Sequence, residues 1–195
     1  NDRPSFGANN PQSNTPEKLW DALPEGKAIS IIHHPKFGGR TNWKYHNPRM
    51  QPLVEIYSQW GFSEDGGDWC VRQALQRGYR MGFIGSSDNH QGQMGNFDSG
   101  IAAVIAPELT REAIFESLAT RQCYATTGRR ILLNVTVNDH GMGQEFAAAA
   151  DEPREIAIRA AGTDDIVEVT LVKSGEEIHT CEPDALTFQA TFTDD

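Results

Sequence analysis

The sequence predicts an α/β domain followed by a smaller module of antiparallel strands. Two observations lead to this fold class. Up to Gly128, short apolar runs alternate with helical patterns, which is typical of a largely parallel sheet with helices packed on it. From Ile131 onward, apolar and polar residues alternate over short segments separated by turns, as in antiparallel strands. We therefore expect two parts, residues 1–128 and residues 129–195.

Three helices are expected in the first part. One begins at Thr15-Pro16, where a hydroxyl can cap the helix and proline fits the first turn. A second is expected over residues 68–79, and a third over residues 110–121, capped by Thr110. In the second helix, the positions expected to be buried are Trp69, Val71, Leu75 and Tyr79.

Four apolar runs in the first part have the composition of buried parallel strands, namely residues 28–32 (AISII), 53–57 (LVEIY), 81–84 (MGFI) and 100–105 (GIAAVI). The second part ends at Phe192-Thr-Asp-Asp, where a further strand would be expected. A β-sandwich needs roughly seven strands, so this part is predicted to be an incomplete, sandwich-like antiparallel module.

The charge of the chain excludes one class of partner. Its formal net charge is −10, with 17 basic residues scattered among 27 acidic ones, whereas binding to a phosphate backbone relies on clustered Lys and Arg. No apolar run approaches the roughly 18 residues that a membrane span requires. We therefore expect neither nucleic acid nor membrane as a partner, and both a cytoplasmic and an exported location stay open. Cys70, Cys123 and Cys181 lie far apart and form no zinc-ribbon spacing, so we expect small buried side chains.

Polar side chains follow three of the predicted strands and point to a metal site. His33-His34-Pro35 follows the first strand, Glu55 lies in the second, and Asp88-Asn89-His90 follows the third. In parallel sheets, ligands and catalytic groups gather at the carboxyl ends of the strands. On an irregular turn, which Gly85, Ser86 and Ser87 would permit, residues i and i+2 can share one ion. We therefore predict His34, Asp88 and His90 as metal ligands.

Imidazole and carboxylate together suit zinc, manganese or iron. A metal held in this way lowers the pKa of bound water and supplies hydroxide near neutral pH, which is the chemistry of a hydrolase. No side chain is singled out as catalytic apart from Glu55 as a possible accessory group. An isolated Asp-x-His is also compatible with a turn that contains a hydrogen-bonded acid.

The roles of the neighbouring residues stay open at this point. Adjacent strand residues point to opposite faces, so at most one of His33 and His34 is expected to face the site. Glu55 lies within an apolar strand and must be paired, as a ligand, as a partner for an imidazole or in a structural salt bridge. Lys36 and Arg40 could hold an anionic substrate such as a phosphate ester, or they could be solvated loop charges.

Four motifs in this order, IIHHP, VEIYS, GFIGSSDNH and TREAIFESLATRQCYATTG, resemble the polymerase and histidinol phosphatase (PHP) superfamily, in particular a poorly characterised bacterial branch of PHP-like metallohydrolases. The resemblance covers roughly Pro16 to Gly143. It implies a distorted (β/α)7 TIM-like barrel, two or three ions of zinc, manganese or iron, and hydrolysis of phosphate esters. Carried over by position, it implies His34, Asp88 and His90 as ligands, and Glu55 matches a further family position.

The sequence departs from that family in one respect. The family's H-x-H pair on the first strand occurs nowhere in this sequence. The resemblance therefore implies that residues 1–128 are the C-terminal half of a barrel whose first half is missing. Such a piece would hold a partial site and would be inactive alone. It would also expose apolar sheet edges, so we expect a dimer or larger assembly.

Three hypotheses follow. The leading one is a metal-dependent hydrolase that acts on a small-molecule ester or phosphoester. The second is a non-catalytic binding module on a degenerate PHP scaffold. The third is a structural fragment without a site, which predicts that His34, Asp88 and His90 lie more than about 8 Å apart, too far to share metal ions with bonds near 2 Å.

Overall fold

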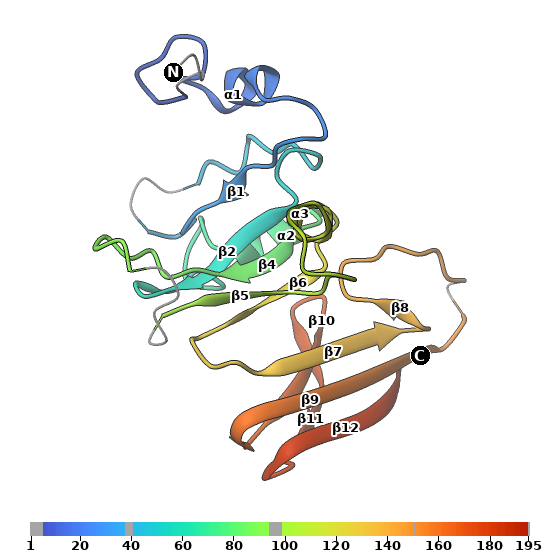
Figure 1. Ribbon diagram of the computed structural model, residues 1–195. Coiled ribbons are helices and arrows are strands. Elements are labelled where there is room, and N and C mark those ends of the chain that lie inside the picture. Colours follow the sequence, from blue (N-terminus) through green and yellow to red (C-terminus); the bar gives the residue numbers. More distant parts are fainter. Residues whose placement is uncertain (1–5, 38–40, 94–98, 150, 195) are drawn as a thin grey trace.

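The computed structural model describes residues 6–37, 41–93, 99–149 and 151–194. The helix nearest the N-terminus lies at one end of the molecule and the strands of the C-terminal part at the other, with the parallel strands between them (Figure 1). In chain order the elements are α1 (Pro16–Ala22), β1 (Ile31–Ile32), β2 (Leu53–Ser58), β3 (Gly61–Phe62), α2 (Val71–Gln76), β4 (Gly82–Gly85), β5 (Ile101–Val104), α3 (Arg111–Ala119), β6 (Cys123–Thr126), β7 (Leu132–Val137), β8 (His140–Gly141), β9 (Arg154–Ile166), β10 (Val169–Lys173), β11 (Glu176–Cys181) and β12 (Ala185–Asp194).

The three expected helices are present, and two have the expected caps. The hydroxyl of Thr15 accepts a hydrogen bond from the backbone N–H of Lys18 at 3.4 Å, and that of Thr110 accepts one from Ala113 at 3.2 Å. These bonds satisfy backbone donors that have no partner within the helix. Helix α2 is shorter than expected, and Leu75, an expected core position, is exposed.

Three of the predicted strands form one parallel arrangement. Both β1 and β4 pair in parallel with β2, so β2 lies between them. The short strand β3 turns back and pairs antiparallel with the end of β2. The carboxyl ends of β1 and β4 therefore flank the same central strand.

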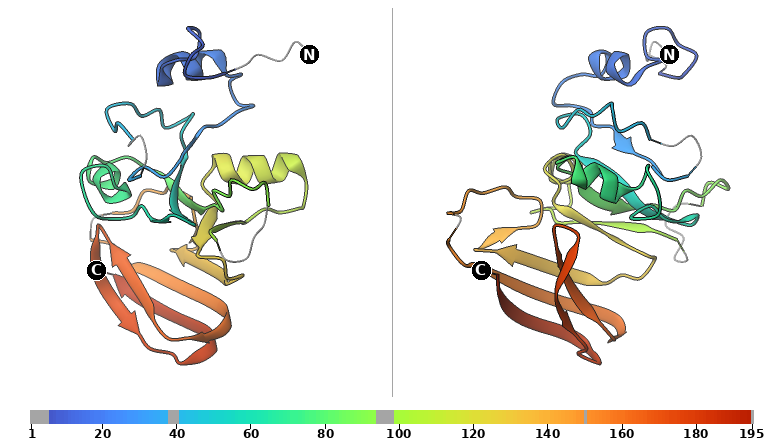
Figure 2. Two further views of the ribbon diagram at one scale, coloured as in Figure 1. Left: turned by 90° about the vertical axis from the view of Figure 1, so that its left-hand side faces the viewer. Right: turned by 180° about the vertical axis from the view of Figure 1, so that it is seen from behind.

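Both faces of β2 are covered, which explains its continuous apolar run. Successive residues of a strand point to opposite faces. Val54 packs in a cluster with residues of β1 and α2, and Leu53 packs in a second cluster with Ile84 and Cys123. Helices α2 and α3 lie on opposite sides of these strands (Figure 2, left).

The predicted barrel is wrong. Strands in several separate sheets dominate the described residues, only three short helices accompany them, and no closed barrel forms. A (β/α) barrel requires a helix after each strand, yet the described residues between β1 and β2 contain none. Strand β5, which was expected to extend the parallel sheet, pairs antiparallel with β6 in a two-stranded sheet. The α/β fold class and the TIM-like half barrel are both corrected by these pairings.

The C-terminal strands form an antiparallel sheet in the order β12-β9-β7-β8, accompanied by the separate hairpin β10-β11. Ile156 and Ile158 of β9 are buried. Arg121 pairs with Glu145 and Arg72 donates to the carbonyl of Gly175, so contacts join the two parts. The division at residue 128 stays a prediction. Within the described residues, no helix has the length and apolar character needed to cross a membrane.

Candidate metal centre

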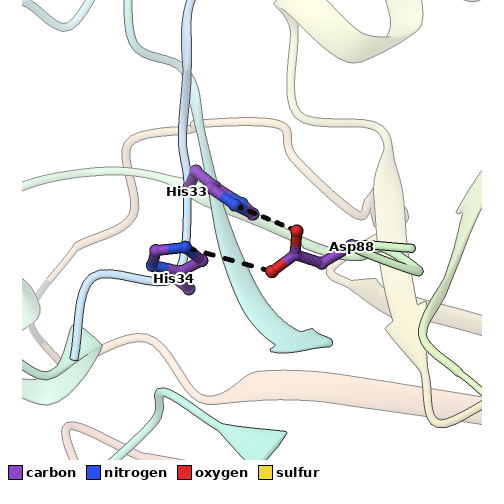
Figure 3. Close-up of side chains that lie close together, drawn as sticks. All are labelled: His33, His34 and Asp88. Atoms are coloured by element: carbon purple, nitrogen blue, oxygen red, sulfur yellow. Dashed lines mark ion pairs between the residues drawn. The ribbon is translucent and has the colours of Figure 1, made fainter. Parts of the chain in front are cut away.

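Three side chains from two separate segments converge at the ends of β1 and β4. His33 and His34 directly follow β1, and Asp88 follows β4. Each offers one possible ligand atom, and these atoms all lie within 4.8 Å of one another. Both imidazoles point toward the carboxylate of Asp88 (Figure 3). They meet because β1 and β4 flank β2 and run in the same direction.

The spacing of these atoms matches ligands around an ion better than it matches hydrogen bonds. Nε2 of His33 is 3.5 Å from Oδ1 of Asp88, and Nε2 of His34 is 3.9 Å from Oδ2. Hydrogen bonds between nitrogen and oxygen are usually about 2.7–3.2 Å long. Tetrahedral bonds of about 2.1 Å place ligand atoms about 3.4 Å apart. The cluster therefore has the dimensions of a site that can hold one cation.

Backbone geometry explains why both histidines face the site, where at most one was expected. The backbone of His34 has a φ of +23° and that of Asp88 a φ of +45°. Residues other than glycine rarely adopt positive φ angles. The alternation of faces applies only within a strand, and β1 ends at Ile32. Such strained residues cluster at functional sites.

Glu55 of β2 lies behind the histidines and orients them. Its carboxylate is 3% exposed, with Oε2 at 2.9 Å from Nδ1 of His33 and Oε1 accepting from the backbone N–H of His34 at 3.1 Å. Ser86 donates its hydroxyl to the same carboxylate. Of the alternatives left open by the sequence, Glu55 is therefore the partner of an imidazole. With Nδ1 of His33 bound to Glu55, Nε2 is directed at Asp88.

A close backbone approach holds Ser86 in place. A Cβ atom on Gly100 would lie 2.6 Å from the carbonyl oxygen of Ser86 and 2.7 Å from that of Tyr57. Only glycine fits this position without displacing backbone. A supporting role for Ser86 was not predicted, because the turn alone accounts for a small residue at this position.

One nitrogen of the cluster is left without a partner. Nδ1 of His34 is buried, and no atom of the described residues forms a hydrogen bond with it. Nearly all buried polar atoms in proteins are satisfied, so each exception calls for an explanation such as a bound ion or water. A cation bound through Nε2 of His34 would leave the proton on Nδ1, so the partner of Nδ1 would be a second group, as in other metal-binding histidines.

His90 lies at the rim of the cluster. Its Nε2 is 3.4 Å from Oδ1 of Asp88, but its side chain is largely exposed and it does not belong to the group of three. The carboxylate oxygens of Asp88 lie 3.4 Å from Nε2 of His90 and 3.9 Å from Nε2 of His34. A fragment without a site was expected to separate these residues by more than about 8 Å, and this expectation is wrong. Trp60 lies beside His90 with the two ring centroids 5.6 Å apart.

Lys36 and Arg40 were predicted as possible substrate-binding residues. The ammonium of Lys36 lies 5.8 Å from the ring centroid of Phe37, and its side chain lines a cavity of about 340 Å³ with Gly66, Gly67 and Trp69. Arg40 lies outside the described residues. Of the three cysteines expected to be buried, Cys70 and Cys123 are buried and Cys181 is only partly buried. Burial raises the pKa of the Cys123 thiol to about 11.

The comparisons with known proteins identify no activity. Residues 96–160 match a family described as a protein of unknown function, DUF3604. The chain is 31% identical over 209 residues to an uncharacterized protein of Chlamydia trachomatis and 30% identical to one of Chlamydia muridarum, and each match covers 91% of this chain and 33% of the relative. An uncharacterized protein of Chlamydia pneumoniae is 32% identical over 166 residues, covering 71% of this chain and 27% of that protein. No solved structure matches.

These findings overturn the resemblance drawn from the motifs. The chain spans about a third of the length of the first two curated relatives, and none of the three carries a described function. The expected membership of the PHP superfamily is wrong, since the match is to DUF3604 and to uncharacterised chlamydial proteins. The chain is therefore similar to proteins of unknown function, and arguments about its chemistry rest on its own residues.

Proposed function

We propose that His33, His34 and Asp88 hold a divalent cation and that the protein is a metal-dependent hydrolase of phosphoesters. The observation that carries this proposal is the convergence of three ligand atoms within 4.8 Å of one another. Two imidazoles and one carboxylate suit zinc, manganese or iron. The number of ions in the whole protein stays open, because the expectation of two or three rested on the PHP resemblance.

The number of ligands favours catalysis over a purely structural role. Structural zinc sites are closed by four protein ligands, whereas catalytic sites have three and leave a position for water or substrate. The described cluster offers three ligands, and half of the His33 side chain is exposed. A cation bound there would lower the pKa of a water molecule and polarise a phosphoryl oxygen.

Within this proposal, Glu55 is a positioning residue and not the general base. Both of its oxygens already accept hydrogen bonds, from His33, His34 and Ser86. Its negative charge fixes the tautomer of His33 with the proton on Nδ1, which leaves Nε2 free as a ligand. His90, largely exposed beside Asp88, is placed to contact the substrate or to complete the coordination.

The test is the metal content and turnover of the full-length protein with Asp88→Ala, measured by plasma mass spectrometry and by release of p-nitrophenol from p-nitrophenyl phosphate. Asp88 contacts all three histidines, so its loss removes a ligand and the carboxylate that they share. We expect metal affinity to fall by more than the ~10–100-fold that follows the loss of a group which only orients a ligand. Turnover is expected to fall with it.

Asp21→Ala is the matched control, because Asp21 is an exposed acid in α1, the helix at the N-terminal end of the molecule (Figure 1). It should retain the metal content and the activity of the wild type. Unchanged metal content in Asp88→Ala would refute the metal site. Metal that depends on Asp88, without hydrolysis of any phosphoester by the wild type, would instead support the non-catalytic binding module.

A further inference from the structure

Trp60 lies in the turn between β2 and β3, at the edge of the candidate metal centre. Its indole is 55% exposed. Its ring centroid is 5.6 Å from that of His90, and the two ring planes are tilted by 50°. Because the rings are tilted, His90 does not lie flat on the indole, and more than half of Trp60 remains exposed.

Contacts within the turn hold the indole beside the cluster. The backbone N–H of Trp60 donates to the hydroxyl of the buried Ser58 at 3.3 Å. The amide of the neighbouring Gln59 donates to the backbone carbonyl of Asp88. The turn is thus bonded directly to the loop that supplies the carboxylate ligand.

A second exposed aromatic on the same hairpin provides a comparison. Phe62 is 56% exposed, but its ring packs against Tyr57 with centroids 4.7 Å apart. The Phe62 ring is thus packed on Tyr57, whereas Trp60 adjoins His90, whose Nε2 is 3.4 Å from Asp88. Of these two aromatics, Trp60 is the one next to the proposed reaction centre.

We infer that Trp60 is a substrate-specificity residue that stacks on a planar aromatic ring esterified to the phosphate. This inference rests on the proposed phosphoester hydrolysis. A phosphoryl group held at the cluster would lie next to His90, and a flat ester substituent that reached past His90 would meet the exposed indole. Stacking of a planar base on an aromatic side chain is favourable for every base, because each base has a π-face. The substrate class is therefore an aryl or nucleobase-bearing phosphate ester and not a short alkyl phosphate.

The experiment compares kcat/KM for phenyl phosphate and ethyl phosphate in the full-length protein loaded with Mn²⁺. The two esters have different leaving groups and differ in intrinsic reactivity. The quantity compared between variants is therefore the ratio of kcat/KM for phenyl phosphate to kcat/KM for ethyl phosphate. In Trp60→Ala we expect the preference for phenyl phosphate to fall about tenfold, mostly through KM, since a tenfold change corresponds to ~1.4 kcal/mol of binding. Trp60→Phe, which keeps an aromatic ring, should recover much of the preference.

Phe62→Ala is the matched control and should leave the ratio unchanged. Metal content, measured for every variant, shows whether the centre itself is intact. Hydrolysis of both esters with an unaltered ratio in Trp60→Ala would overturn the role of Trp60 and leave the proposed function standing. Failure of the metal-loaded wild type to hydrolyse either ester would overturn both.

Discussion

At the scale of single residues, the most constrained group of the centre is the carboxylate of Glu55. It is buried within β2, and a buried charge is costly unless it is paired. Three donors surround it, the imidazole of His33, the backbone N–H of His34 and the hydroxyl of Ser86. A carboxylate can accept all three, because it has about four lone-pair positions. This network orients both histidines before any ligand arrives.

The first prediction concerns Glu55→Gln. Glutamine has nearly the same shape, but its amide nitrogen is a donor and must face one of the existing donors. We expect His33 to lose its fixed orientation and affinity for Mn²⁺ or Zn²⁺ to fall by ~10–100-fold, as in other sites that lose such a partner. Isothermal titration calorimetry measures the change.

Glu17→Gln in the exposed first turn of α1 serves as the control and should bind the metal as the wild type does. Equal affinities for Glu55→Gln and wild type would show that the hydrogen bond to His33 does not support the site. Far-ultraviolet circular dichroism of each variant separates this effect from unfolding.

Much of the centre could be predicted at this scale, and what was missed has a physical reason. The strand-end positions of His34 and Asp88 follow from apolar runs that end in polar residues. The contribution of His33 was underestimated, because its neighbour His34 adopts a φ of +23° and the alternation of a strand no longer applies. The contact of Ser86 with Glu55 was missed, since it depends on which segments meet and local sequence does not specify that.

At the scale of elements, the helix starts were the most predictable feature. Caps such as Thr110 depend on a few adjacent residues, so the sequence alone identifies them. The direction of strand pairing is not local in this way. The run GIAAVI has the composition of a buried parallel strand, yet β5 pairs antiparallel with β6. Residues 105–122, which include α3, separate these two strands.

A charged cluster at the end of β12 gives the second prediction. Asp194 accepts hydrogen bonds from Lys173 of β10 at 2.6 and 2.7 Å and from Arg154 of β9 at 2.9 Å. The hydrogen bond from Lys173, aided by Arg154, lowers the pKa of Asp194 below its ordinary value of 3.8. A carboxyl whose pKa is lower in the folded state stabilises the fold above its unfolded pKa and loses this effect as the pH falls through the folded value.

The measurement is urea unfolding of wild type and Asp194→Asn at pH 7 and at pH 3. The wild type should be the more stable of the two at pH 7, and the difference should shrink at pH 3. Asp165→Asn, an exposed acid in β9, should show no such difference. A gap between wild type and Asp194→Asn that is the same at both pH values would contradict the linkage.

At the scale of the whole molecule, the barrel prediction is wrong because it came from the PHP resemblance, and parallel pairing ends with the strands around β2. The three runs around β2 do pair in parallel, but the segment between β1 and β2 contributes no helix in its described residues. The two-stranded sheet β5-β6 then packs against β4, where a Cβ on Gly85 would lie 2.8 Å from the carbonyl oxygens of Ile101 and Thr126. Such long-range packing is decided by contacts between distant segments, which a periodic pattern does not encode.

The last prediction is that this chain self-associates. The original reason, the open edge of a half barrel, no longer holds, but the C-terminal sheet provides another. In the described part of the chain β12 is a ten-residue edge strand that pairs only with β9, and Leu132, Val167 and Leu186 are each more than half exposed. Unpaired strand edges and exposed apolar side chains both favour association. Multi-angle light scattering over a range of concentrations should therefore detect dimers or larger species.

Leu186→Lys tests whether the edge strand is responsible. A lysine on an edge strand opposes pairing with another chain. The weight-average molar mass from light scattering should therefore fall toward that of the monomer. Leu109→Lys is the control, because Leu109 is 93% exposed but lies before α3, outside the C-terminal sheet. This variant should leave association unchanged. Equal shifts for both variants would indicate general apolar contact instead of pairing through β12. A monomeric wild type at every concentration would contradict the prediction, because the exposed edge would then be tolerated without a partner.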